Sequence, residues 1–130
     1  MGDEKLNIDP WSSSQSTDYS RIIEQFGLSN LNNLTLPEPS HLHRRGIVFA
    51  HRDLDIVLDS QKMGNSFGVL TGLMPSGRMH LGHSMVIEQI KWFQKLGGDV
   101  TIAVADLESQ ATRGVSLAKG REIALNEYVA

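Results

Sequence analysis

The chain has 130 residues, of which 40% are hydrophobic, so it is long enough for one domain or part of one and too apolar for a disordered tail. Its 12 Lys and Arg residues against 15 Asp and Glu residues give a formal charge of -3, which excludes a surface that is basic all over, as general binding to nucleic acid requires. There is no cysteine, which excludes disulfides, cysteine zinc sites and thiolate catalysis.

The sequence contains no signal for a membrane or for secretion. No apolar run approaches the roughly 18 residues that span a bilayer. The N-terminus, MGDEKLNIDP, is acidic and lacks a hydrophobic signal region. We therefore expect a cytoplasmic protein without a membrane partner.

Residues 1–45 predict an N-terminal extension that is partly irregular. A serine-rich stretch over 12–16 is polar, and residues 18–27 predict a short amphipathic helix with an acidic N-cap and a glycine stop. Residues 28–40 contain paired asparagines and Pro-Glu-Pro, which are typical of a loop.

Organised structure is expected from residue 46 to residue 130. After the apolar run Ile-Val-Phe at 47–49, residues 51–59 predict a helix that buries Leu54, Val57 and Leu58. Residues 62–66 (KMGNS) predict a turn.

The rest of the chain alternates strand and helix. Residues 67–71 predict a strand, 72–79 a Gly-, Pro- and Ser-containing loop, 80–96 a helix and 100–105 (VTIAVA) a strand covered on both faces. Strand, loop, helix, strand is a βαβ unit, so the fold class is α/β with a parallel sheet.

Ser116 predicts the N-cap of a last helix that runs to Ala130. No glycine, proline or basic last turn marks the end of this helix. We therefore expect the chain to be a fragment, truncated within an element at its C-terminus.

The segment that indicates chemistry is 71–83 (TGLMPSGRMHLGH), between a strand and a helix. Ligands bind parallel sheets at this edge, and a helix N-terminus attracts anions. His80 and His83, three residues apart, share one face of the first turn and can donate hydrogen bonds to phosphate, while Gly82 leaves room for a flat ring. A surface helix start with two neighbouring histidines is the plain alternative. A zinc site has weaker support, since no carboxylate ligand stands nearby, and we expect no metal ligands in the chain.

Residues 75–83 (PSGRMHLGH) closely resemble the HIGH signature of the class I aminoacyl-tRNA synthetases. Residues 8–11 (IDPW), 18–19 with 26–27, and above all 44–53 (RRGIVFAHRD) are similar to the extension of archaeal and eukaryotic tryptophanyl-tRNA synthetases. The resemblance implies the N-terminal part of a Rossmann-like catalytic domain. It covers most of the chain, from about residue 8 onward.

The resemblance also implies roles for particular residues. His80 and His83 would stabilise the ATP phosphates during catalysis. The ATP site would be formed by Gly72, Pro75, Ser76, Gly77, His80, Leu81, Gly82 and His83. The amino acid would contact Leu70, Gly72, Ala103, Asp106 and Glu108, with Glu108 by the ammonium group.

For Asp106, a strand-end cap or a solvated ion pair is the alternative role. Leu70 and Ala103 depart from the eukaryotic relatives, in which similar positions carry Tyr and Gln that reach the indole nitrogen. Neither Leu nor Ala can form that hydrogen bond.

The expected function is therefore ATP-dependent tryptophan–tRNA ligation, incomplete in this chain. Its partners would be tryptophan, ATP with Mg²⁺ as co-substrate, the tRNA for tryptophan and a second subunit in a homodimer. Because Leu70 and Ala103 cannot bind the indole nitrogen, a tyrosyl-tRNA synthetase is one alternative. A truncated, non-catalytic ATP- or RNA-binding module is the other, because the second class I signature loop, which closes on the triphosphate, is missing.

Other patterns have plainer interpretations. The histidines and arginines between 41 and 52 form a local basic cluster that either contacts tRNA or is simply solvated. Trp92, on the predicted long helix, is expected in the core or in a subunit interface.

Overall fold

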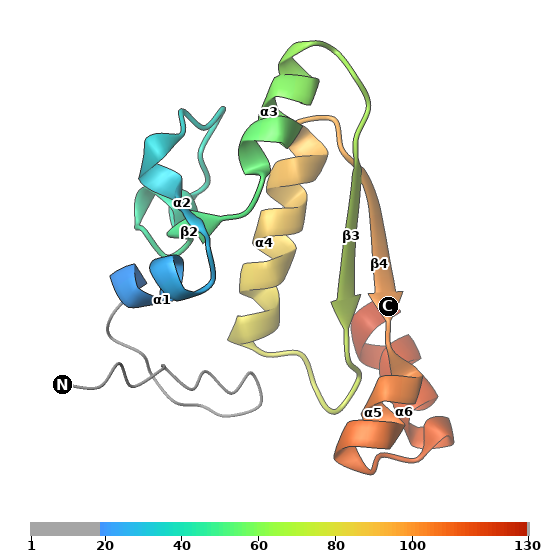
Figure 1. Ribbon diagram of the computed structural model, residues 1–130. Helices are drawn as coiled ribbons and strands as arrows, with labels where there is room; N and C mark the ends of the chain where they lie inside the picture. Colours follow the sequence, from blue (N-terminus) through green and yellow to red (C-terminus); the bar gives the residue numbers. More distant parts are fainter. Residues whose placement is uncertain (1–18, 130) are drawn as a thin grey trace, which may run out of the picture. The chain divides into compact units, whose positions relative to one another are not determined.

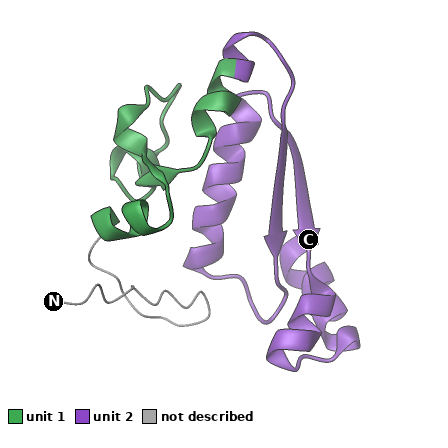
Figure 2. Ribbon diagram, viewed as in Figure 1, with its two compact units in different colours: residues 1–59 green, residues 60–130 purple. Residues whose placement is uncertain are grey.

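The computed structural model describes residues 19–129, and the chain divides into two compact units, residues 1–59 and 60–130 (Figure 2). The motif at 8–11, the serine-rich stretch and the acidic N-cap at 18 lie outside the described residues. The boundary expected after residue 45 is of another kind, because it divides an N-terminal extension from a catalytic domain. The two compact units do not test it, and it stays a prediction.

The first unit is built from short elements (Figure 1). Helix α1 (Tyr19–Gln25) ends before Gly27, whose φ of +58° is the left-handed conformation that glycine adopts most readily. Strand β1 (Ser29–Asn30) pairs antiparallel with β2 (Ala50–His51), and the 3₁₀ turn η1 (Leu31–Asn33) follows β1. The loop expected over 28–40 thus contains a two-residue strand and one helical turn.

Two further helices follow in sequence, α2 (His41–Arg44) and α3 (Leu54–Lys62). Sequence patterns predicted α3 with a start at residue 51 and three buried positions. The helix starts later because Asp53 has a φ of +58°, which breaks helical geometry. Of the three expected core residues only Leu58 is buried; Leu54 and Val57 are partly exposed.

The second unit contains the predicted βαβ unit. Strand β3 (Gly68–Leu73), helix α4 (Leu81–Lys95) and strand β4 (Asp99–Val104) follow one another, and the two strands pair in parallel from Gly68–Asp99 to Leu73–Val104. Figure 1 shows α4 running alongside both strands. The prediction of an α/β fold with parallel strands is confirmed.

The sheet has one covered and one open face. Leu73 points to the covered face and is 6% exposed, whereas Leu70, on the other face, is 74% exposed. Thr101 and Ala103 of β4, on the same face as Leu70, are exposed as well, and Ile102, on the face of Leu73, is 43% exposed. The prediction that residues 100–105 are covered on both faces is therefore wrong for this structure, because α4 packs along a sheet of only two strands. In α4 itself Trp92 is buried, as expected.

Three helical segments follow β4: α5 (Asp106–Arg113), α6 (Leu117–Ile123) and the π-helix η2 (Ala124–Val129). Ser116 caps α6 as predicted, its Oγ accepting a hydrogen bond from the Lys119 N–H at 3.3 Å. The single last helix that was expected changes to π-helical geometry at Ala124, and α5 was not predicted. Within residues 19–129, no helix is both long enough and apolar enough to cross a bilayer.

Candidate functional site

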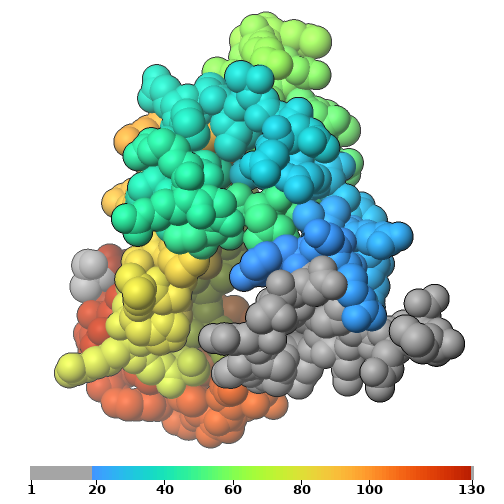
Figure 3. Space-filling model, turned by 90° about the vertical axis from the view of Figure 1, so that its left-hand side faces the viewer, coloured from blue at the N-terminus to red at the C-terminus, as the bar shows by residue number. Residues whose placement is uncertain are grey.

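The candidate site lies at the carboxyl ends of β3 and β4 in the second unit. The loop over 74–80, which we call the signature loop, leads from β3 to the N-terminus of α4, and α5 and α6 follow β4 at the same end of the strands (Figure 1). The first turn of α4 reaches the molecular surface, where its atoms are yellow in Figure 3, and Leu81 is 80% exposed. This is the edge at which parallel sheets bind ligands.

His80 and His83 together cap α4. The Nδ1 atom of His80 accepts a hydrogen bond from the Gly82 N–H at 3.2 Å, and the His80 N–H donates to Nδ1 of His83 at 3.2 Å. The two ring centroids are 4.0 Å apart. The predicted proximity of the two histidines is therefore present. However, the Gly82 N–H, at the helix N-terminus that was expected to face an anion, is occupied by a histidine ring.

The capping bonds determine which nitrogen carries the proton. A backbone N–H can only donate, so both Nδ1 atoms are acceptors, and in the neutral rings the proton is assigned to Nε2. Burial, and secondarily the charge of His80, lower the pKa of His83 below its usual value of 6.5. At neutral pH His83 is thus a neutral ring with an Nε2–H donor.

Two side chains of helix α5 contact the signature loop. Ser109 is fully buried, and its hydroxyl donates to the carbonyl oxygen of Pro75, itself buried, at 3.0 Å. Thr112 Oγ1 lies 3.3 Å from the sulfur of Met74. Sequence reasoning missed both residues because it assigned no helix there.

A signal for α5 was nevertheless present. The run DLESQATRG has acidic residues in the first turn, Arg113 in the last turn and Gly114 at the C-terminal cap, with a φ of +65°. Helix α5 is strongly polar, and this explains why hydrophobic periodicity did not reveal it.

The other residues expected to bind ATP surround the two histidines. Gly72 lies in β3, while Pro75, Ser76 and Gly77 lie in the signature loop, where the Ser76 N–H donates to the Met74 carbonyl in a tight turn. A Cβ atom on Gly82 would lie 3.0 Å from Cε1 of His80. Glycine at this position therefore allows the His80 ring to fold over the helix start.

The residues expected to contact the amino acid form two groups. Leu70, Gly72 and Ala103 share the open face of the sheet, because Gly72 pairs with Ala103 and side chains alternate along a strand. Asp106 and Glu108 lie in the first turn of α5, where Glu108 is exposed.

Asp106 already has a partner. Its Oδ2 atom lies 3.0 Å from Nε of Arg121, and this hydrogen bond lowers the pKa of the carboxyl group. Asp106 Oδ1 also accepts from the Leu107 N–H at 2.8 Å. An ammonium group would have to share Asp106 with Arg121, whereas Glu108 offers an exposed carboxylate.

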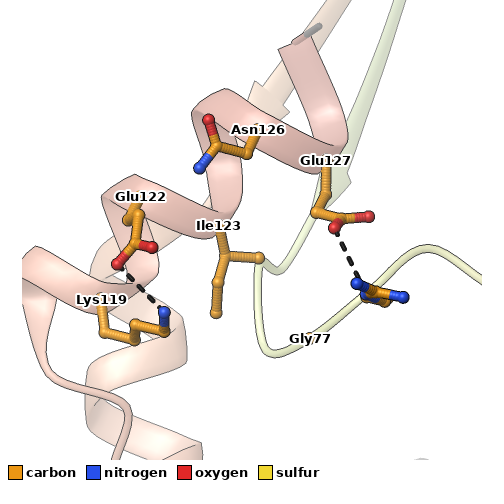
Figure 4. A pocket seen from close by; sticks show the side chains of 7 residues that line it. Gly77, Lys119, Glu122, Ile123, Asn126 and Glu127 are labelled. Atoms are coloured by element: carbon orange, nitrogen blue, oxygen red, sulfur yellow. Dashed lines mark hydrogen bonds and ion pairs between the residues drawn. The ribbon is translucent and has the colours of Figure 1, made fainter.

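A pocket of about 310 Å³ lies between the signature loop and the C-terminal helices (Figure 4). It was not predicted from the sequence. Its charged residues form two ion pairs, Lys119 with Glu122 at 3.0 Å and Arg78 with Glu127 at 3.6 Å. Because positive and negative charges are paired within the wall, the pocket presents no field of one sign.

The basic cluster of the first unit has structural partners. Arg44 donates to the Pro39 carbonyl and Arg52 to the Phe26 carbonyl, while Nδ1 of His51 accepts from the Leu54 N–H at 3.2 Å. These hydrogen bonds hold turns together, and a role in tRNA binding stays a prediction.

The comparisons with known proteins agree with this geometry. A family model described as "tRNA synthetases class I (W and Y)" matches residues 61–130. The tryptophan–tRNA ligases of Methanosarcina acetivorans and Thermoplasma acidophilum are 44% and 48% identical, each over 94% of this chain. A crystal structure of tryptophanyl-tRNA synthetase from Aeropyrum pernix superposes with a TM-score of 0.78 at 40% identity, over 94% of this chain and 35% of that one.

The chain belongs to the class I tRNA synthetases of the tryptophan and tyrosine family. Its fold is the first part of the Rossmann-like catalytic domain of that class. Within the family, the resemblance to archaeal tryptophanyl-tRNA synthetases is confirmed by these relatives, although the chain spans only 28% of the length of the first two.

Proposed function

We propose that the chain supplies the ATP site of a tryptophan–tRNA ligase, which forms tryptophanyl-adenylate from ATP and tryptophan and transfers tryptophan to its tRNA. The observation that carries the proposal is the pair of histidines at the start of α4, each with its Nδ1 atom accepting from the backbone, so that Nε2 is the donor side of each ring. The tryptophan–tRNA ligases among its relatives support the choice of amino acid.

In the proposed reaction the tryptophan carboxylate attacks the α-phosphorus of ATP and pyrophosphate leaves. His80 and His83 donate hydrogen bonds to phosphate oxygens and stabilise the charge that moves toward the leaving group. Gly82 would allow adenine to approach the helix start once the His80 ring that lies against it moves aside, and Gly72, Pro75, Ser76, Gly77 and Leu81 would border the nucleotide. Mg²⁺ would arrive with the triphosphate rather than in a cage of protein ligands.

The amino acid would lie over the open face of the sheet. Leu70, Gly72 and Ala103 offer it an apolar floor, and Glu108 at the first turn of α5 would bind its ammonium group, with Asp106 beside it. Since neither Leu70 nor Ala103 can bind the indole nitrogen, this floor supplies shape and apolar contact, and the polar selection of indole comes from other groups.

We further propose that residues 46–130 begin the catalytic domain and residues 1–45 form an extension to it. The partners of the complete enzyme would be the tRNA for tryptophan and a second subunit in a homodimer, and it would act in the cytoplasm, where translation uses its product.

Calorimetric titration with tryptophan and with tyrosine, each with ATP and Mg²⁺ present, tests the choice of substrate. We expect heat with tryptophan alone. Heat with tyrosine alone would replace the proposal with a tyrosyl-tRNA synthetase, the alternative favoured by the nonpolar Leu70 and Ala103. ATP binding without a response to either amino acid would favour a non-catalytic nucleotide-binding module.

Replacement of His83 by Ala tests the phosphate donor. In the full-length gene product we expect tryptophan-dependent ATP–pyrophosphate exchange to fall about 100-fold, the usual effect of removing one transition-state donor. His41→Ala, the same change at an exposed residue of α2, is the matched control, and pyrophosphate exchange needs no tRNA. Equal rates in His83→Ala and the control would remove His83 from the mechanism.

A further inference from the structure

Tyr128, in the π-helix η2, contacts both the signature loop and the second histidine of the signature. Its Oη atom lies 3.2 Å from Nε2 of His83 and 3.3 Å from the carbonyl oxygens of both Met74 and Gly77. The tyrosine and His83 rings meet edge to face, with centroids 5.5 Å apart and planes at 89°. One partly buried hydroxyl thus joins His83 to two carbonyl groups of the signature loop.

The direction of each of these hydrogen bonds follows from the capping geometry. Because Nδ1 of His83 accepts from the His80 N–H, the proton of the neutral ring is on Nε2 and points at Tyr128. The tyrosine oxygen must then accept from Nε2–H, and its own proton goes to the carbonyl of Met74 or Gly77. The chain of donors runs from the backbone of the helix start through the imidazole and the phenol to the loop.

A second contact ties the same helix to the same loop. Glu127, the residue before Tyr128, forms an ion pair with Arg78 at 3.6 Å, and Figure 4 shows its carboxylate directed at the loop beside Gly77. π-Helical turns are rare and occur often at functional sites, and here the wider turn brings consecutive residues to the loop.

We propose that Tyr128 is a positioning residue for His83: its hydroxyl accepts from Nε2–H, orients the imidazole and holds the signature loop against it. The inference rests on the proposed function, in which this Nε2–H is the donor to phosphate. A phosphate oxygen of ATP would then meet an imidazole ring that is already oriented. This oxygen would accept from Nε2–H of His83, either together with the tyrosine oxygen or in its place. Preorganisation of this kind lowers the cost of aligning a catalytic group.

Tyr128→Phe removes the hydroxyl and keeps the ring that packs on His83. The first measurement is the set of imidazole ¹⁵N chemical shifts in the 130-residue chain, which report the protonation and hydrogen bonding of each ring nitrogen and need no activity. We expect the Nε2–H tautomer in both proteins, because the His80 N–H still donates to Nδ1, and a changed Nε2 shift in Tyr128→Phe, because Nε2–H loses the phenol oxygen as its acceptor. Tyr19→Phe, the same change in α1, where the ring lies 4.5 Å from that of Phe49, is the control and leaves His83 unchanged. Identical His83 shifts in wild type and Tyr128→Phe would overturn the proposal.

The second measurement is a double-mutant cycle on pyrophosphate exchange in the full-length gene product. Tyr128→Phe should lower kcat about 2- to 10-fold, the range expected for one hydrogen bond, with little change in KM for ATP. In the His83→Ala background, Tyr128→Phe should lower kcat no further, because Tyr128 acts through His83. An equal loss in both backgrounds would show that Tyr128 acts on the fold, and this would overturn the proposal. If His83→Ala by itself leaves pyrophosphate exchange unchanged, the proposed function is refuted instead, while the ¹⁵N shift of Nε2 still tests the role of Tyr128.

Discussion

At the level of single residues, the two signature histidines differ in what surrounds them. His80 is exposed, whereas His83 is partly buried beside His80 and Tyr128. Burial and the like charge lower the pKa of His83, so the ring stays neutral under conditions in which an exposed histidine is partly protonated. A neutral donor with a fixed tautomer would bind phosphate through the orientation of its hydrogen bond more than through charge.

This pKa makes stability depend on pH. The unfolded chain binds a proton at His83 near pH 6.5, but the folded chain does so only at lower pH, so the unfolded state carries more protons between the two values. The neutral His83 ring therefore costs the folded state nothing above about pH 6.5, whereas below that pH proton uptake by the unfolded chain lowers the free energy of unfolding. We expect the free energy of unfolding, measured with urea, to decline between about pH 7 and pH 5.5, and to decline less in His83→Gln. Parallel curves for the two proteins would contradict the assignment.

Ser109 is the second residue on which a prediction rests. Ser109→Ala removes the buried hydroxyl that donates to Pro75, leaving a buried carbonyl without that donor, so we expect a loss of about 1–3 kcal/mol in the free energy of unfolding. Ser84→Ala is the control, since the exposed Ser84 hydroxyl bonds only within α4 and its loss should change stability by less than about 0.5 kcal/mol. Urea denaturation of both variants decides, and equal losses would argue against an anchoring role for Ser109.

At the level of elements, the join between α4 and β4 is the tightest point of the βαβ unit. A Cβ atom on Gly98 would lie 2.7 Å from Cε2 of Phe67, 2.9 Å from Cγ2 of Val69 and 3.0 Å from the carbonyl oxygen of Phe93. The backbone oxygen cannot move aside as a side chain can. Only glycine lets the chain turn from α4 into β4 this closely.

Gly98→Ala should therefore destabilise the second unit by about 1–3 kcal/mol through overpacking. Gly68→Ala is the matched control: Gly68 begins β3, has no atom within 4 Å of a Cβ, and should be neutral or slightly stabilising. Thermal unfolding followed by circular dichroism compares the two. A melting temperature for Gly98→Ala at or above that of Gly68→Ala would show that the turn can relax.

At the level of the whole molecule, the second unit is a two-stranded parallel sheet with a large difference between its faces. Leu73 is 6% exposed on the face toward α4, and Leu70 is 74% exposed on the other. The open face includes the residues proposed to contact the amino acid, so a ligand bound there would cover exposed apolar surface.

The two leucines should respond differently to the same substitution. Leu73→Ala should cost about 2–5 kcal/mol, because it opens a cavity in the packed face. Leu70→Ala should change stability by less than about 0.5 kcal/mol, since little packing is lost. The free energies of unfolding from urea titrations make the comparison, and a large cost at Leu70 would mean that the open face is covered in solution.

Much of this architecture follows from local sequence. The βαβ unit was predictable because glycines and periodic apolar residues mark α4 and its flanking strands. His80 and His83 meet because they are the N-cap and N3 residues of α4, and not because both lie on one helical face as expected. The polar helix α5 could have been found from its charges and Gly114, but not from hydrophobicity.

The sequence by itself determined the family, the parallel βαβ unit and the two histidines of the signature, because each depends on residues close together in the chain. Only the tertiary structure decided that Ser109 and Tyr128 hold the loop, 34 and 54 residues away from Pro75 and Met74. It also decided that one sheet face is open. Interactions over that distance in the chain depend on how elements pack, and packing is set by the sum of many weak interactions that no local pattern encodes.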